Sequence, residues 1–492
     1  MAVVVAIDAG TTGVRALAVD DAANVVGISY RELTQYFPRP GWVEHDAREI
    51  FDLVEETLAE LAADLAERRE AIAAVGITNQ RETAVAWDRD TGQPLHRAIV
   101  WQDRRTADRS RELEDAGHLE LVRTRTGLVL DSYFSATKWE WMFRHGGLSR
   151  TPALALGTVD DWISWKLTGR HSTDPSNASR TMCFDLTVGE WSPELCDLFG
   201  IDQQMLGEVV PSSGRIATIT GEVAGGRLAG IPISGIAGDQ QSALFGHHCI
   251  EPGQTKVTYG TGSFVLMNLG PNLPAPSDGL LTTVAWQLGD AGALEYALEG
   301  AVFSSGATIQ WLRDGLGIID EASEIGPLAA SVASSEGVFV VPAFTGLGSP
   351  WWDPHARGTI VGLTRGAGRA HLARATVEAM AYQTRDVLDA MQASAGCKVS
   401  VLRADGGAAA MDLLLQLQAD QCGVPVVRPA TTEVTALGAA FLAGIAEGVW
   451  TAEEVGGLVS EDRRSEPVRS KASADADHRR WLDALARSRN WD

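Results

Sequence analysis

Two short turns rich in glycine and threonine are the first candidates for chemistry in this sequence. The first turn comprises Gly10, Thr11, Thr12 and Gly13, and the second turn comprises residues 260–262. Glycine permits close approach, and backbone amides and hydroxyls can donate hydrogen bonds to phosphate oxygens. A single turn of this kind favours an ordinary tight hairpin. Because a strand, a small-residue turn and a second strand occur in both places, over residues 3–20 and 255–268, the pair favours a clamp for a triphosphate.

A second candidate is a carboxylate that could act as a general base. Asp239 lies in the small-residue segment 235–240, which allows a substrate to approach closely, and Gln240 beside it could bind a neighbouring hydroxyl. An alcohol that attacks a phosphoryl group needs a nearby group to accept its proton. The alternative is that Asp239 caps a helix beginning at about Gln240. The pattern by itself favours the cap, and one side chain can fill both roles.

The elements that must position these residues alternate between helix and strand, as in α/β folds. Apolar residues at three- and four-residue spacing predict a helix over residues 48–70. Further helices are expected over residues 371–391 and 411–422, and strands over residues 73–78 and 399–403. Since each half opens with a β-hairpin, we expect two domains, residues 1–249 and 250–450. Residues 451–492 read as a charged surface appendage with one short amphipathic helix.

Composition excludes several classes of partner. The 492 residues carry a net charge of −23, which repels nucleic acid and acidic membrane surfaces. No apolar run approaches the roughly 18 residues of a membrane span, and the N-terminal strand lacks the basic region of a signal peptide. The five cysteines are scattered singly, which indicates a reducing, cytoplasmic compartment.

Several common catalytic motifs are missing from the chain. It contains no G-x-x-x-x-G-K-[ST] loop, and no G-x-G-x-x-G, H-E-x-x-H or G-x-S-x-G. The usual P-loop, dinucleotide, zinc-protease and serine-hydrolase sites are therefore not supported.

Several longer stretches resemble the FGGY family of carbohydrate kinases, and within it the glycerol kinases. The matching stretches are residues 76–83, 98–106, 126–135, 157–162, 173–182, 238–246 and 342–354. Residues 133–142 and 362–382 also resemble the two signatures of that family, so the resemblance covers most of residues 1–448. It implies two ribonuclease H-like α/β domains of the actin and hexokinase type, with a catalytic cleft between them. It also implies ATP-dependent phosphorylation of glycerol or a similar small polyol.

The resemblance assigns Asp239 as the base and implies a polyol site at six positions, which are Arg81, Glu82, Trp101, Tyr133, Asp239 and Phe264. Gln240, whose amide could bind a neighbouring hydroxyl, is a further candidate for the polyol. Hydroxyl groups need hydrogen-bonding partners, and the carbon chain needs an apolar face. Taken alone, Arg81 and Glu82 would be a surface ion pair, and Trp101 and Phe264 would be core aromatics.

The nucleotide is expected between the two turns. The ATP-binding residues are Thr11, Thr12, Gly13, Arg15, Thr261, Gly262, Gly306, Gln310, Gly407 and Met411, of which Gly306, Gln310 and Gly407 resemble the adenosine side of the family's site. Asp8 is expected to hold Mg²⁺ through water, because magnesium prefers oxygen ligands and seldom has an all-protein cage. The alternative is that Asp8 is a turn-forming residue at a strand end.

The chain departs from the family pattern at three places. Met411 stands where glycerol kinases usually carry an asparagine that contacts adenine, which predicts a less base-selective site. Gly13 replaces the more usual serine. Residues 225–230 lack the Gly-Thr-Arg pattern that some bacterial relatives use for fructose bisphosphate, so that regulation is not expected.

Two alternatives to glycerol phosphorylation stay open at the level of sequence. One is a sister FGGY kinase that acts on another small polyol or ketose, and the other is a non-catalytic, actin-like ATP-binding sensor. The sensor is disfavoured because Asp8, Thr11, Thr261 and Asp239 are all present. Family habit suggests a homodimer or homotetramer.

Overall fold

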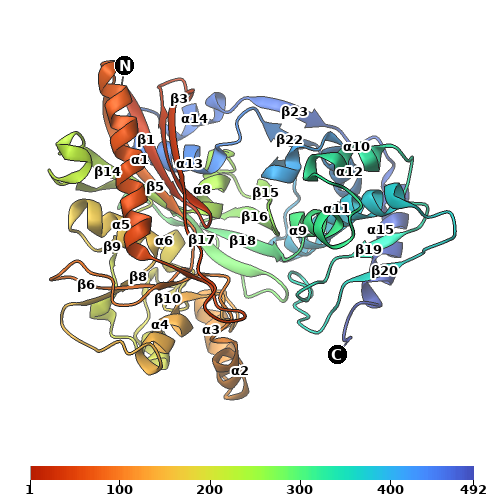
Figure 1. Cartoon of the computed structure of the whole chain (residues 1–492), viewed down its shortest axis with the longest axis horizontal. Coiled ribbons are helices and arrows are strands. Elements are labelled where there is room, and N and C mark those ends of the chain that lie inside the picture. The colour runs from red at the N-terminus through yellow and green to blue at the C-terminus, as the bar shows by residue number, and fades with distance from the viewer. Residues whose placement is uncertain (1, 492) are drawn as a thin grey trace.

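Two mixed β-sheets organise the chain in the computed structural model, which describes residues 2–491 (Figure 1). The first sheet has the strand order β13-β14-β5-β1-β2-β3. Its strands are β1 (Ala2–Ala9), β2 (Gly13–Val19), β3 (Val25–Glu32), β5 (Ala71–Asn79), β13 (Ser213–Thr218) and β14 (Pro232–Gly238). Strands β1, β5 and β14 run parallel, and the others pair antiparallel.

The second sheet repeats this arrangement with one extra edge strand, β17. Its order is β17-β18-β16-β15-β21-β22-β23. Its strands are β15 (Thr255–Tyr259), β16 (Ser263–Gly270), β17 (Leu281–Gln287), β18 (Leu294–Val302), β21 (Leu402–Asp405), β22 (Val426–Pro429) and β23 (Glu461–Ser465). Read across the first sheet from β3 to β13, the neighbouring strands form two antiparallel pairs, then two parallel pairs, then one antiparallel pair. The second sheet shows the same order of pairs from β18 to β23. The two β-hairpins expected from sequence are therefore the matching β1–β2 and β15–β16 pairs.

The long helices form where the apolar periodicity predicts them. Helix α1 (Ala47–Glu67) begins after Asp46, whose side chain accepts a hydrogen bond from the amide of Arg48, and it buries Ile50, Val54, Leu58, Leu61 and Leu65. It packs on β2 and β3. Helices α11 (Arg369–Ala395) and α12 (Asp412–Cys422) cover the second sheet. The remaining helices are α2 (Ala107–Asp115), α3 (Leu119–Thr126), α4 (Ser135–Arg144), α5 (Val159–Thr168), α6 (Pro175–Ala178), α7 (Pro193–Phe199), α8 (Asp239–Gly246), α9 (Gly306–Gln310), α10 (Ile325–Ala330), α13 (Val434–Ala446), α14 (Ala452–Leu458) and α15 (Lys471–Ala486).

Short strands complete the structure around the two sheets. They are β4 (Glu44–His45), β6 (Val85–Asp88), β7 (Ala98–Ile99), β8 (Leu154–Gly157), β9 (Ser172–Thr173), β10 (Phe184–Asp185), β11 (Glu190–Trp191), β12 (Glu208–Val209), β19 (Phe339–Val341) and β20 (Thr359–Val361). Within residues 2–491, no helix has both the length and the apolar character that crossing a membrane requires.

Helix α13 joins the two halves, because it comes late in the chain but packs on the first sheet. It contacts β1, β5, β14 and α8. The approach is so close that a Cβ atom added at Gly76 would lie 2.1 Å from the carbonyl oxygen of Ala439, and one added at Gly438 would lie 1.8 Å from that of Ser242. Glycine is required at both positions for this contact.

The C-terminal stretch differs from its expected character as a charged surface appendage. Strand β23 is the edge of the second sheet and pairs with β22. Helix α15 buries Trp481 and Leu485 against β19 and α11, and its His478 Nε2 lies 2.6 Å from Asp386 Oδ1. The short amphipathic helix expected in this stretch is therefore α15, but the abundance of charge in the sequence did not reveal that its one apolar face is packed.

Candidate active site

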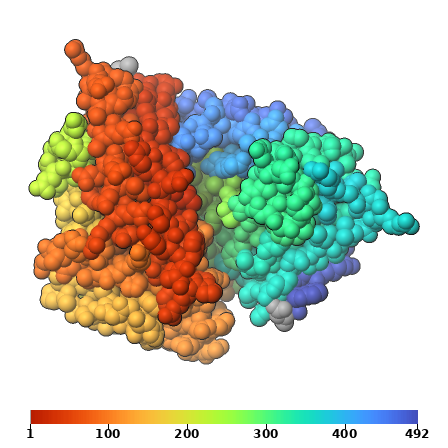
Figure 2. All heavy atoms as spheres, in the orientation of Figure 1, coloured from red at the N-terminus to blue at the C-terminus, as the bar shows by residue number. Residues whose placement is uncertain are grey.

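The carboxyl ends of three parallel strands bring together residues that lie far apart in the sequence. Asp8 on β1 is paired in register with Thr78 on β5, and Asn79 at the end of β5 is paired with Gly238 on β14. Arg81 and Glu82 follow β5, and Asp239 follows β14. Because parallel strands end at one edge of the sheet, all four side chains belong to the same side of the N-terminal domain. Figure 2 shows a hollow between this domain and the green to cyan part of the C-terminal domain.

Asp239 is the first residue of α8 and faces a guanidinium group. Its Oδ1 accepts a hydrogen bond of 2.7 Å from the amide of Gln240 and lies 3.1 Å from Arg81 Nε. The side chain keeps 31% of its exposure. Desolvation by the surrounding protein raises the pKa of this carboxyl above its ordinary 3.8, although Arg81 and Lys256 oppose the shift. Asp239 thus stands at the helix start and also keeps a partly exposed carboxylate beside Arg81.

Arg81 and Glu82 are buried, unlike an ordinary surface pair, since each is 2% exposed. Glu82 has φ +61°, a left-handed conformation that costs a non-glycine residue about 1–3 kcal/mol and often marks a functional site. Its carbonyl oxygen accepts hydrogen bonds from Ser135 Oγ at 3.1 Å and Lys138 Nζ at 3.2 Å. These contacts hold the strained turn that places both side chains.

Three aromatic residues from separate segments meet beside Arg81. The ring centroid of Trp101 lies 5.7 Å from that of Tyr133 and 6.4 Å from that of Phe264, both in edge-on geometry. Arg81 stands over the Phe264 ring at 6.0 Å, and its Nη2 lies 3.4 Å from the Tyr133 hydroxyl. Since Phe264 belongs to β16, the C-terminal domain supplies one wall of this aromatic cluster.

Gln240 is held by a lysine of the opposite domain. Lys256 Nζ on β15 donates to Gln240 Oε1, and also to Thr258 Oγ1 at 2.8 Å. Burial lowers the pKa of Lys256 to about 8, against the opposing effect of Asp405 and Asp239. The contact leaves the amide nitrogen of Gln240 available as a donor.

The first turn lies next to the aromatic cluster. Its hairpin is closed by a 3.0 Å hydrogen bond from the amide of Gly10 to the carbonyl of Gly13, and Thr11 Oγ1 accepts a 3.0 Å hydrogen bond from Trp101 Nε1. A Cβ atom added at Gly13 would lie 2.4 Å from the Tyr30 hydroxyl. Tyr30 therefore fills the space that a serine would need at position 13.

Arg15, expected to add positive charge, is paired with acidic side chains. Its Nη1 lies 2.5 Å from Glu433 Oε2 and 3.8 Å from Asp8 Oδ2. Part of its charge is thus balanced by the protein itself. Burial, together with the nearby Asp239 and Glu433 charges, raises the pKa of Asp8 to about 7, although Arg15 opposes the shift. Within the described chain no group of three metal-ligating side chains occurs.

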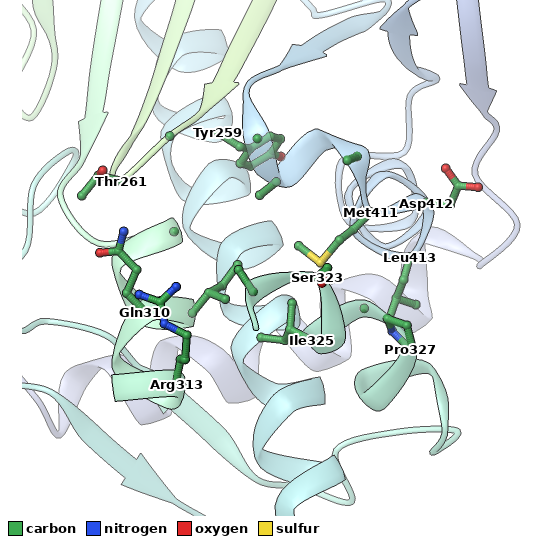
Figure 3. Close-up of a pocket in the computed structure, with 18 of the residues that line it drawn as sticks. Tyr259, Thr261, Gln310, Arg313, Ser323, Ile325, Pro327, Met411, Asp412 and Leu413 are labelled. Atoms are coloured by element: carbon green, nitrogen blue, oxygen red, sulfur yellow. The ribbon is translucent and has the colours of Figure 1, made fainter. Parts of the chain in front are cut away.

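The second turn opens into a pocket of about 850 Å³ in the C-terminal domain (Figure 3). Of the predicted nucleotide residues, Thr261, Gly306, Gln310, Gly407 and Met411 line it. Gly306 packs directly on the turn, since its amide donates to the Gly260 carbonyl at 2.9 Å. A volume of this size suits a ligand of nucleotide dimensions.

The pocket wall that faces Met411 was not anticipated from sequence. Arg313, Ser323, Ile325, Gly326 and Pro327 also line it, and Figure 3 shows the Met411 sulfur directed toward Ser323 and Ile325. Gly262 of the second turn, the first turn and the residues near Asp239 lie outside this lining. The structure therefore groups the predicted residues into an N-terminal polar and aromatic site and a C-terminal pocket.

Sequence reasoning also missed two buried charges beside Arg81. Arg180 and Glu299 are fully buried, and Glu299 accepts hydrogen bonds from both arginines. Glu299, near the middle of the largely apolar strand β18, was a signal in the sequence, because an unpaired charge is seldom buried.

The fold and the site together define a two-domain kinase of small hydroxylated molecules. Residues 3–246 match the model of the FGGY family of carbohydrate kinases, N-terminal domain, and residues 255–447 match that of the C-terminal domain. The chain belongs to the FGGY family of carbohydrate kinases.

The chain also resembles individual relatives along its whole length. It is 53% identical over 501 residues to glycerol kinase of Dechloromonas aromatica (strain RCB), covering 99% of this chain and 98% of that protein. The structure of Plasmodium falciparum glycerol kinase with ADP superposes with a TM-score of 0.93 at 31% identity, covering 99% and 98% of the two chains. A xylulose kinase from Brucella ovis gives a TM-score of 0.89 at 25% identity, covering 98% of each.

Proposed function

We propose that this protein transfers the γ-phosphoryl group of ATP to glycerol, forming glycerol 3-phosphate, with Asp239 as general base. The observation that supports it best is the partly exposed Asp239 carboxylate 3.1 Å from Arg81 Nε, because Arg81 also contacts Tyr133 of the aromatic cluster. The identity of about half of all residues to glycerol kinases over the full length supports the same substrate.

The polyol is held by the N-terminal site. Arg81 and Glu82 bind its vicinal hydroxyl groups, and the Gln240 amide donates to a third polar position. Trp101, Tyr133 and Phe264 form an apolar wall for the carbon chain. The hydroxyl to be phosphorylated is placed against Asp239, which takes its proton as the oxygen attacks the phosphorus in line.

ATP lies with its adenosine in the C-terminal pocket and its phosphates between the two turns. Thr11, Thr12 and Gly13 on one side and Thr261 and Gly262 on the other donate to phosphate oxygens. Domain closure excludes water, which limits transfer of the phosphoryl group to water.

Asp8 fits a water-mediated ligand of Mg²⁺, because the negative charge of Asp239 and Glu433 around it is what a cation would balance. When bound, Mg²⁺ would neutralise charge on the phosphates. Calorimetry with Mg²⁺ and ADP should show weaker joint binding for Asp8→Asn than for the unchanged chain.

Replacing the base tests the mechanism. Asp239→Asn should keep glycerol binding and slow turnover by about 10²–10⁴-fold, the usual contribution of a general base. Turnover is measured by coupled ADP release, and glycerol binding by calorimetry. Asp278→Asn, at a side chain that is 97% exposed, is the matched control. Near-normal turnover of Asp239→Asn would remove this residue from the role of base.

A sister kinase for another polyol or ketose is the second candidate, favoured by the likeness to the xylulose kinase fold. One methylene or hydroxyl changes selectivity by only about 1–3 kcal/mol. Coupled ADP release with glycerol, dihydroxyacetone, erythritol, xylulose and ribulose separates the candidates by kcat/KM. Absence of turnover with all five would instead favour a non-catalytic ATP-binding sensor.

We also infer a cytoplasmic homodimer or homotetramer. All five cysteines are unpaired, which suits a reducing compartment, and ATP is available there. Light scattering coupled to size-exclusion chromatography would contradict the assembly if it gave the mass of one chain, 52.5 kDa.

A further inference from the structure

A carboxylate of the C-terminal domain lies between two guanidinium groups of the N-terminal domain. Glu299 on β18 accepts from Arg81 Nη1 at 2.5 Å through Oε2, and from Arg180 Nη2 at 2.8 Å through Oε1. All three side chains are at most 2% exposed. Each oxygen of Glu299 therefore serves a different arginine, across the boundary between the domains.

The contact closes a ring of four buried charges. Arg180 Nε donates to Glu82 Oε1 at 2.6 Å, and Arg81 Nε lies 3.8 Å from the same oxygen. The positive charges of the two arginines balance the negative charges of Glu82 and Glu299, and buried charges need such partners. Burial opposes the ionised form of Glu299, but Arg180 and Arg81 outweigh it and hold the pKa of Glu299 below its ordinary value.

The contact with Glu299 therefore sets the orientation of the Arg81 guanidinium, and with it the partner that each nitrogen faces. Its Nη1 is directed to Glu299 and to Gln241 Oε1 at 3.3 Å, which leaves Nη2 near the Tyr133 hydroxyl and Nε at Asp239. The guanidinium is a rigid planar fork, so fixing one nitrogen fixes the direction of the others.

We propose that Glu299 is a positioning residue for the polyol site: it orients Arg81 from the opposite domain, so that the substrate-binding geometry is complete only when the two domains are in contact. This inference rests on the proposed function, in which Arg81 binds substrate hydroxyls. Lys256 makes a second contact of the same kind, from β15 to Gln240. Both charged residues reach from the second sheet to side chains of the first domain.

Shortening the carboxylate distinguishes positioning from simple neutralisation of charge. Glu299→Asp keeps the charge but is one methylene shorter, so it cannot reach both arginines in their present places. We expect the KM for glycerol to rise about 10–100-fold, the size of one lost charged hydrogen bond, with a smaller change in kcat. Coupled ADP release gives both constants, and binding of ADP to the C-terminal pocket should be unchanged. A KM within twofold of the unchanged chain would overturn the proposal.

A charge-balanced double variant covers the case in which single variants are unstable. Arg180→Gln with Glu299→Gln removes one charge of each sign, so the buried site stays neutral. It should fold and still show the raised KM for glycerol, whereas recovery of a normal KM would overturn the proposal. Asp386→Asn is the control, because this buried carboxylate contacts His478 and Trp481 instead. It should lower the melting temperature and leave the KM unchanged.

A structural readout separates this inference from the proposed function. In a crystal structure of Glu299→Asp, the separation of Arg81 Nε and Asp239 Oδ1 should exceed the present 3.1 Å. Retention of that separation would overturn the positioning role, whatever the substrate. Absence of glycerol turnover in the unchanged chain would defeat the proposed function alone, and the crystal structure would still decide the role of Glu299.

Discussion

At the scale of single residues, opposing effects of the surroundings set the chemistry of Asp239. Desolvation favours its neutral form, while Arg81 and Lys256 favour the carboxylate. Desolvation wins, so the pKa lies above 3.8. The carboxylate nevertheless remains within reach of the positive charge of Arg81, which suits the proposed role of Asp239 as a base close to an anionic nucleotide.

This balance predicts the pH dependence of the reaction. Only the carboxylate form of Asp239 can accept a proton, so kcat/KM for glycerol should fall as the pH falls through the raised pKa. The contribution of Asp239 to the acid limb should lie above pH 3.8 and approach a tenfold fall per pH unit, and Asp8→Asn, which removes the group with a pKa of about 7, should retain it. Rates are measured between pH 4 and 8, and samples returned to neutral pH control for unfolding. A constant kcat/KM down to pH 4 would contradict the prediction.

Met411 predicts a weakly base-selective nucleotide site. A methionine packs on a purine through its polarisable sulfur but offers no strong hydrogen bond to the base. The kcat/KM values for ATP, GTP and CTP should therefore lie close together. Met411→Asn should raise the preference for ATP about three- to tenfold, the value of one neutral hydrogen bond. Met411→Leu, which keeps the apolar packing, is the control. A strong preference for ATP in the unchanged chain would refute this idea.

At the scale of elements, the glycine that begins α9 and the one in the loop after β21 differ in the space around them. A Cβ atom at Gly306 would lie 2.6 Å from the Gly260 carbonyl oxygen, whereas one at Gly407 would meet no protein atom within 4 Å. Both glycines line the pocket. The first is needed for packing, and the second borders open space in the pocket.

This difference predicts separable effects of two alanine variants. Gly306→Ala should raise the KM for ATP and lower the melting temperature, because backbone must move. Gly407→Ala should raise the KM for ATP without lowering the melting temperature. Gly457→Ala, on the outer helix α14 with open space around it, should change neither. Steady-state kinetics and thermal unfolding measure both quantities. An unchanged KM for Gly407→Ala would place the nucleotide elsewhere.

At the scale of the whole molecule, the two halves share a hydrophobic core as well as a chain connection. Helix α13 of the second half contributes Leu437 and Phe441 to a core that includes Val4, Ala6 and Leu17 of the first sheet. The chain therefore crosses from one domain to the other more than once. The domain boundary at residue 249 remains a prediction from the sequence. This boundary would assign the first sheet and α13, the helix that covers it, to different domains.

The placement of α13 predicts that residues 1–249 will not fold stably alone. Without α13, the apolar face formed by β1, β5 and β14 is exposed to water. The fragment should aggregate or unfold without a cooperative transition, as followed by circular dichroism and size-exclusion chromatography. The same fragment with residues 431–450 fused through a flexible linker should recover a cooperative transition. Equal behaviour of the two fragments would contradict this account of the core.

The sequence alone determined the local elements and most of the candidate site. Periodic apolar residues predicted α1, α11 and α12, and the two glycine-threonine turns predicted the repeated hairpins. The resemblance to FGGY kinases singled out Asp239, Arg81 and the pocket residues around Gly306. These features depend on neighbouring residues or on motifs, so they can be read along the chain.

Only the tertiary structure decided which distant groups meet. Arg81 and Glu299 are 218 positions apart, and Arg15 and Glu433 are 418 apart. Their pairing depends on how two sheets and a crossing helix pack together. Local periodicity indicates which face of an element is buried, but it does not identify the distant charged residue that packs against that face. For that physical reason, the packing of α15 and the buried ring of charges could not be read from the sequence.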